Sequence, residues 1–88
     1  MDGNLNARIK EGDVVLHFKH ELDSEENLYA YLYVVRAIAT HTETEEQLVI
    51  YQNSKTLRYF ARPLENFEGK VDKKKYPTVK QEYRFVPW

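Results

Sequence analysis

Two short segments hold the residue types best suited to chemistry. The first runs from His41 to Tyr51, where a polar, acidic connection with one histidine leads into an apolar strand that ends in a tyrosine. The second begins where Arg62 directly precedes Pro63. Imidazole, carboxylate, phenol and guanidinium groups together can bind a phosphate, a carboxylate or the edge of a base. The sequence therefore predicts a polar-ligand site made of His41, Glu43, Tyr51 and Arg62, with His17 nearby.

A structural interpretation explains the same residues. Arg62 can pair with Glu43 or Glu46 and fix the connection between two strands, while His41 bonds to the backbone of its own turn. Ion-pair networks of this kind are common outside functional sites. Residue types and spacing leave both interpretations open.

Metal binding is a third interpretation. His41 and Glu43 lie two residues apart, so both point the same way on an extended chain, and His17 or His20 would complete a set of three zinc ligands. However, pairs with this spacing are common in turns, and no His-Glu-x-x-His pattern is present. We therefore predict neither a metal site nor a cofactor, and a small hydrolase using His41 with Glu43 is the least favoured function.

Other classes of enzyme lack the residues they need. Neither Ser24 nor Ser54 lies in a Gly-x-Ser-x-Gly elbow, and the three glycines are too scattered for a phosphate-binding loop. Cysteine is absent, which removes disulfides, thiolate metal sites and cysteine nucleophiles. The chain is therefore expected to bind a partner rather than to catalyse a reaction.

The charges are distributed unevenly along the chain. Residues 1–53 hold four Lys/Arg against ten Asp/Glu, and residues 54–88 hold nine against four. Cations beside aromatic rings are typical of single-strand nucleic-acid binding, and the predicted contacts are Lys70, Lys73, Lys74, Lys75 and Arg84. Against this, the isoelectric point is about 6.3, the acidic loop 21–26 would repel phosphate, and a fold that interleaves its strands mixes the two halves.

Length and patterning predict one small β domain. With 88 residues and 42% hydrophobic content, we expect a flexible tail over residues 1–10 and a single domain over residues 11–88. The chain has no apolar run long enough for a signal peptide or a membrane span, which predicts a cytoplasmic protein.

Apolar alternation predicts five strands in the order 14–19, 28–40, 47–52, 56–61 and 81–86. The second is expected to be bent or bulged. A helix over the same stretch is the competing interpretation, because Leu28, Leu32 and Val35 also fit a helical stripe, but aromatic and β-branched residues favour the strand. A helical turn capped by Asp23 or Ser24 is possible before it.

The connections complete this prediction. Pro63 should end the fourth strand and open a helical turn that reaches Phe67. Residues 68–78 should form a polar loop. Short strands separated by turns favour a mostly β fold, a small antiparallel SH3-like barrel.

Several motifs together resemble the domain-of-unknown-function 1653 family, from Gly12 to Val86. They are His17-Phe18-Lys19, Tyr33-x-Val35, Ala39-x-His41-x-Glu43-Thr44-x-Glu46-x-Leu48-Val49-x-Tyr51, Arg62-Pro63-x-x-x-Phe67 and Arg84-Phe85. The resemblance implies a small bacterial protein of uncharacterised function, for which nucleic-acid binding has been suggested by modelling. The recurring polar positions of the family fall here on His17, His41, Glu43, Tyr51 and Arg62.

The chain departs from the family pattern at three positions. His20 stands where a glycine is common, Gln52 where an arginine often follows the tyrosine, and Phe60 where a tryptophan is frequent. Nucleic-acid binding is the leading functional prediction. The alternative is a protein-interaction module or homodimer that uses a strand edge or a tyrosine-rich face made of Tyr29, Tyr31 and Tyr33.

Overall fold

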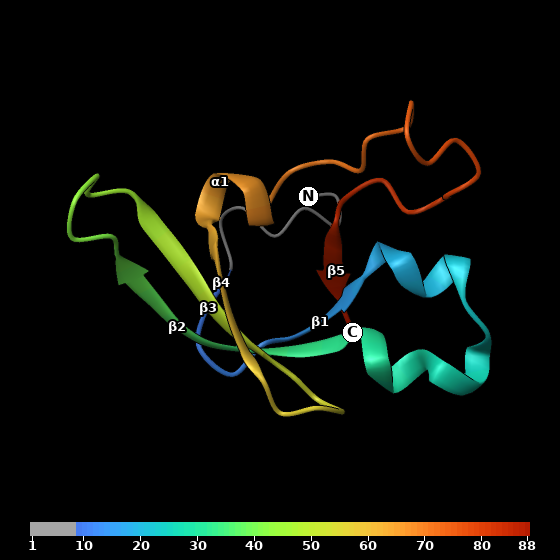
Figure 1. The fold of residues 1–88 in the computed structure, drawn as a ribbon, viewed down its shortest axis with the longest axis horizontal. Helices are drawn as coiled ribbons and strands as arrows, with labels where there is room; N and C mark the ends of the chain where they lie inside the picture. Colours follow the sequence, from blue (N-terminus) through green and yellow to red (C-terminus); the bar gives the residue numbers. More distant parts are fainter. Residues whose placement is uncertain (1–8) are drawn as a thin grey trace.

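The computed structural model describes residues 9–88, which form one antiparallel sheet of five strands in the order β4-β3-β2-β1-β5 (Figure 1). The strands are β1 (Val14–His17), β2 (Leu32–Thr40), β3 (Gln47–Asn53), β4 (Tyr59–Pro63) and β5 (Phe85–Pro87). This architecture confirms the mostly β prediction with five strands. Most of the predicted tail, residues 1–8, lies outside the described residues.

The sheet is open, so the strands do not close into the SH3-like barrel expected from the sequence. β4 and β5 lie at its two edges and do not pair with each other. β5 has only three residues, which pair with β1 alone. The two edges meet through side chains, because the guanidinium of Arg62 on β4 lies 5.5 Å from the ring centroid of Phe85 on β5. The ring of Phe67 in α1 stacks on the same ring, with centroids 4.1 Å apart and an interplanar angle of 7°.

Two predicted strands are shorter than expected because turns of 3-10 helix replace parts of them. Residues Phe18–Leu22 form η1 directly after β1, and residues Glu25–Tyr31 form η2 directly before β2. The prediction of a strand from residue 28 is wrong up to Tyr31. The expected Ser24 cap is confirmed, since its side chain accepts from the Glu26 N–H. Among residues 9–88, no helix is long and apolar enough to cross a membrane.

The bulge expected in the second strand is present, since the register of β2 against β3 shifts between Val35 and Ala37. Pro63 ends β4 as predicted, and α1 (Leu64–Phe67) follows. The last strand is wrong before Phe85: of residues 81–84, only Tyr83 pairs, in a single bridge to Lys70.

The main core lies between α1 and one face of the sheet. It consists of Val15, Val35, Val49, Tyr51, Phe67 and Phe85, all buried. A second, smaller cluster of Phe18, Val71 and Val79, with Tyr76 against it, lies under the loop between α1 and β5. Because His17 is two residues from Val15 on the same strand face, it reaches the boundary between the two clusters.

The predicted tyrosine-rich face is not formed. Tyr29 and Tyr31 belong to η2, and the hydroxyl of Tyr31 donates to Asp23 over 2.6 Å. Tyr33 lies on β2, where its ring packs against Tyr51 with centroids 5.2 Å apart. The alternation in the sequence ends at the junction of η2 with β2, so the three tyrosines do not lie on one face of the sheet.

Candidate functional site

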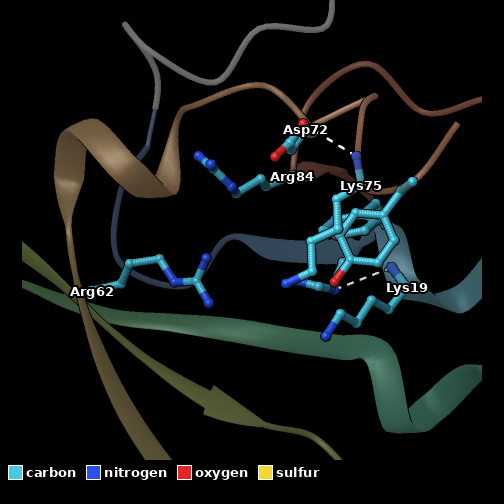
Figure 2. Close-up of a pocket in the computed structure, with 8 residues that line it drawn as sticks. Lys19, Arg62, Asp72, Lys75 and Arg84 are labelled. Atoms are coloured by element: carbon cyan, nitrogen blue, oxygen red, sulfur yellow. Dashed lines mark hydrogen bonds between the residues drawn. The ribbon is translucent and has the colours of Figure 1, made fainter. Parts of the chain in front are cut away.

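A pocket of about 280 Å³ opens between the core and the loop that precedes β5. Its lining comes from four parts of the chain: the end of β1 with the start of η1, the end of β4, the 72–76 loop and the residue before β5. The lining residues are His17, Phe18, Lys19, Arg62, Asp72, Lys75, Tyr76 and Arg84. Within residues 9–88, it holds four cationic side chains and one carboxylate. Figure 2 shows Arg62 reaching the hollow from β4 and Lys75 and Lys19 from the opposite side, while the Arg84 side chain runs along the upper border toward α1.

Arg62 reaches the pocket in a fixed orientation. Its Nε donates to the Tyr51 hydroxyl over 3.2 Å, and its Nη1 donates to Oδ1 of Asn66 over 3.1 Å. The guanidinium also lies over the ring of Phe85, 5.5 Å from its centroid. The register explains the first contact, since Arg62 pairs with Val49 and is therefore the diagonal neighbour of Tyr51. Within the part of the chain that the structure describes, no hydrogen bond occupies Nη2.

Arg84 is held by the same asparagine. Its Nη1 donates to the backbone carbonyl of Asn66 over 2.9 Å. Gly69 makes room for it, because a Cβ at this position would collide with Nη1 of Arg84. Among residues 9–88, neither arginine forms an ion pair, so no carboxylate of this part of the chain neutralises either guanidinium. Two predicted contacts, Arg62 and Arg84, are thus brought together by α1.

His17 forms the floor of the pocket. Its Nδ1 accepts the Lys19 N–H over 3.1 Å, which places the proton of the neutral ring on Nε2. Burial, with a further contribution from Arg62, lowers the pKa of His17 from 6.5 to about 4. The imidazole is therefore neutral near pH 7 and offers one N–H donor. Burial also raises the pKa of Tyr51, which keeps its hydroxyl protonated beside Arg62.

The two lysines share one aromatic support. Nζ of Lys19 lies 5.8 Å and Nζ of Lys75 lies 5.6 Å from the ring centroid of Tyr76. The Tyr76 ring packs edge-on against Phe18, with centroids 4.9 Å apart. Cation–π contacts of this kind hold an ammonium group near a ring while most of its charge stays available. Tyr76 thus positions both lysines at the rim.

Asp72, the carboxylate in the lining, already has a structural role. Its Oδ1 accepts the backbone N–H groups of Lys74 and Lys75 over 3.0 Å and 3.3 Å. This turn directs Lys75 into the pocket. Asp72 therefore offsets the positive charge only in part.

His41 and Glu43 lie elsewhere, in the turn between β2 and β3 at the left of Figure 1, away from η1 and the 68–84 loop. Nδ1 of His41 accepts the N–H groups of Glu43 and Thr44 over 3.1 Å and 3.4 Å. The structure thus brings His17, Tyr51 and Arg62 together and leaves His41 and Glu43 out. The expected pairing of Arg62 with Glu43 or Glu46 is not formed among the described residues.

The turn between β3 and β4 explains what His41 does. There, Oδ1 of Asn53 accepts the N–H groups of the residues two and three positions on, both over 2.9 Å. In each turn the fourth residue, Thr44 or Thr56, accepts an N–H with its hydroxyl. The fifth residue has a positive φ, 66° in the first turn and 64° in the second. His41 therefore caps a turn, as Asn53 does.

The remaining predicted nucleic-acid contacts are divided. Lys75 and Arg84 line the pocket. Lys70 forms an ion pair with Glu82 over 3.3 Å, and Nζ of Lys73 donates to the backbone carbonyls of Val79 and Gln81. Lys74 is exposed and is not part of the lining formed by the described residues.

The sequence did not point to several residues of the site. Lys19 and Asp72 line the pocket, Asn66 anchors both arginines and Gly69 accommodates Arg84. A signal for Asn66 existed, because it lies four residues after Arg62 and therefore within reach across the first turn of α1. Gly69 and Asp72 depend on the path of an irregular loop, which no periodicity reveals.

No group of three or more His, Asp or Glu side chains in residues 9–88 is arranged to hold a metal ion. The site is therefore best described by its four cations, its neutral imidazole N–H and its phenol. Such a donor set fits an oxyanion.

Comparison with known proteins gives one result. No curated protein and no solved structure matches the chain. A family model, described as protein of unknown function (DUF1653), matches residues 13–87, nearly the whole chain. The matched range includes the site arginines Arg62 and Arg84 and the core residues Phe67 and Phe85. The chain therefore belongs to the DUF1653 family.

Proposed function

We propose that this domain is a binding module for nucleic acid, and that the pocket holds a phosphate group of the strand. The observation that carries the proposal is the convergence of Arg62, Arg84, Lys19 and Lys75 on one hollow. Phosphate contacts supply much of the affinity of proteins for nucleic acid, and they come mainly from arginine and lysine.

The orientation of the arginines supports this function. Arg62 has three contacts and Arg84 has one, all to groups on β3, α1 or β5. A guanidinium held before the ligand arrives loses less conformational entropy on binding than a freely rotating one. Each charge-assisted hydrogen bond from such a group contributes about 1.5–3 kcal/mol.

The test is a titration of the protein with short single-stranded DNA and RNA, followed by fluorescence anisotropy at several salt concentrations. The logarithm of the affinity should fall with the logarithm of the salt concentration, with a slope of roughly −0.7 for each phosphate neutralised. The Arg62→Gln variant should bind about tenfold more weakly or worse, because a charge-assisted bond is lost.

Matched lysine variants locate the surface. Lys75→Gln removes a charge from the pocket, and Lys55→Gln removes one from the β3–β4 turn. The first should weaken binding and make the salt slope shallower, and the second should leave both unchanged. Equal effects of the two variants, or no oligonucleotide binding by the unchanged protein, would contradict the proposed function.

Asp72→Asn tests the sign of the charge effect. Asparagine keeps an oxygen that can accept the N–H groups of Lys74 and Lys75, so the turn should persist. Removing the carboxylate should strengthen oligonucleotide binding. A loss of affinity with an intact fold would show that Asp72 contacts the ligand as an acceptor.

A second candidate function is self-association through β4. This strand lies at a sheet edge, and Leu57 and Tyr59 beside it are 64% and 62% exposed. An edge with apolar side chains can pair with the same edge of a second copy. Sedimentation over a range of protein concentrations tests this, and a mass that stays monomeric would exclude it.

A further inference from the structure

We propose that the pocket takes the terminal phosphate at the end of a nucleic-acid strand rather than an internal phosphodiester. This inference deepens the proposed function and rests on it. It concerns which phosphate of the strand occupies the pocket between η1, β4 and the loop before β5.

The arrangement of the cations is the first argument. Lys19, Arg62, Lys75 and Arg84 come from four separate parts of the chain and surround one hollow (Figure 2). An internal phosphate has the chain continuing on both sides, so a protein that binds it offers a groove with cations along the path. A hollow with cations around it suits a group attached to the ligand at one point only.

The number of donors is the second argument. Two of the N–H groups of Arg62 are used by Tyr51 and Asn66, and one of Arg84 by Asn66. Within residues 9–88, the other N–H groups of both guanidinium groups, the ammonium groups of Lys19 and Lys75, and Nε2–H of His17 form no hydrogen bond. An internal phosphodiester offers two unesterified oxygens, whereas a terminal phosphate offers three strong acceptors. The donor set is therefore matched better by a terminal phosphate.

The charge balance points the same way. Four cations and the carboxylate of Asp72 line the pocket, which leaves an excess of positive charge larger than one unit. A phosphodiester carries a single negative charge, and a terminal phosphate carries about −1.5 to −2 near pH 7. The doubly charged group neutralises more of the excess.

Among residues 9–88, two lysines near the pocket that could extend a path for a passing strand already have partners. Lys70 is paired with Glu82, and Lys73 is bonded to backbone carbonyls of its own loop. On the η1 side, Glu21 accepts the N–H groups of Lys80 and Gln81 over 2.8 Å each. These bonds join Glu21, at the start of the acidic segment 21–26, to the end of the loop before β5, at the right of Figure 1. A strand that continued in this direction would meet carboxylates.

The experiment compares one short single-stranded sequence with different ends, at constant salt. The four ligands carry a 5′-phosphate, a 3′-phosphate, hydroxyls at both ends, or a 5′-phosphate blocked as its methyl diester. We expect at least one phosphorylated end to bind about tenfold more tightly than the hydroxyl form, as one added charge-assisted bond predicts. The methyl diester should lose most of this gain, and inorganic phosphate should compete.

Two variants assign the preference to the pocket. In Gly69→Ala the new methyl group meets Nη1 of Arg84, which displaces the guanidinium while the charge stays on the chain. In Arg84→Gln the charge is removed. Both should reduce the ratio of affinities for phosphorylated and unphosphorylated ends, and Lys55→Gln should keep it.

The outcomes separate the two proposals. Equal binding of all four ligands would overturn the terminal-phosphate inference and leave the nucleic-acid function standing. Binding of inorganic phosphate without binding of any oligonucleotide would overturn both, and would indicate a small phosphorylated ligand. Retention of the preference in Gly69→Ala and Arg84→Gln would show that another surface recognises the end.

Discussion

His17 and His41 form the same local hydrogen bond in two different regions of the molecule. In each, Nδ1 accepts the N–H of the residue two positions on, over 3.1 Å. His17 then lies at the floor of a charged pocket, with its ring 4.9 Å from that of Phe85. His41 lies in a turn at the other end of β2. The local bond explains why a histidine suits both positions, and only the surroundings distinguish a site residue from a cap.

The two regions also differ in how they are attached to the core. The pocket arginines are anchored through α1, Tyr51 and Phe85, which are part of or adjacent to the main core. The turn at His41 is held by bonds among its own residues, in the way that the turn at Asn53 is. Substitutions in the core should therefore disturb the pocket, whereas substitutions in the turn at His41 should alter only the turn itself.

The largest expected effect follows from removing the ring of Phe85, which contacts both Phe67 in α1 and Arg62 in the pocket. Phe85 is 1% exposed, stacks on Phe67 and supports Arg62. Phe85→Ala should lower the free energy of unfolding by about 3–5 kcal/mol, because the lost ring leaves a cavity. Urea denaturation followed by circular dichroism measures this.

Leu57→Ala provides the comparison, since Leu57 is 64% exposed in the β3–β4 turn. Its cost should stay below roughly 1 kcal/mol, as is usual for exposed positions. Similar losses of unfolding free energy in Phe85→Ala and Leu57→Ala would show that the ring beneath the pocket stabilises the fold no more than an exposed turn residue does.

The second effect concerns pH. In the folded protein the pKa of His17 is about 4, because it is buried beside Arg62, against 6.5 for an unshifted group. Between these values the unfolded chain binds more protons, so stability falls as the pH is lowered from 6.5 to 4. The loss should reach up to about 3 kcal/mol, at ~1.4 kcal/mol for each pH unit.

His17→Asn isolates this contribution. Asparagine keeps an acceptor for the Lys19 N–H and does not titrate. Unfolding curves of the variant should therefore be flatter than those of the unchanged protein over this pH range. Parallel curves would mean that His17 is protonated in the folded state.

The smallest effect is expected at the turn. His41→Ala leaves the N–H groups of Glu43 and Thr44 without their acceptor and should cost about 1 kcal/mol. His41→Asn should restore most of this stability, because Asn53 already performs the same role in the β3–β4 turn. Both variants should bind oligonucleotides as the unchanged protein does. Weaker binding by the stable His41→Asn protein would place His41 in the site after all.

Regular patterns in the sequence were enough to predict the strands around the core. Alternation placed β3 within one residue, and Pro63 marked the end of β4. The irregular parts were predicted less well. Residues 28–31 have a pattern that fits both a strand and a helix. They continue the 3-10 helix η2, whose N-terminus the Ser24 side chain caps. The length of β5 depends on the path of the loop before it, which residue types alone do not determine.

The candidate site was predicted in part for a related reason. Tyr51 and Arg62 could be placed together because paired strands bring diagonal neighbours into contact. The residue types of His41 and Glu43 suit catalysis and binding and therefore predict a place in the site. Their turn, however, has the same hydrogen bonds as the turn at Asn53. The repeated pattern, with a capping residue followed by threonine three positions later, was present in the sequence as His41 with Thr44 and Asn53 with Thr56.

The most direct test of the account is an amide NMR titration of the ¹⁵N-labelled protein with a short 5′-phosphorylated single strand, repeated with the 3′-phosphorylated form. The account predicts shift changes at Lys19, Lys75, Tyr76 and Arg84 that weaken in higher salt, with residues 41–46 unchanged. Changes centred on residues 41–46, or an unchanged spectrum at high micromolar ligand, would contradict it.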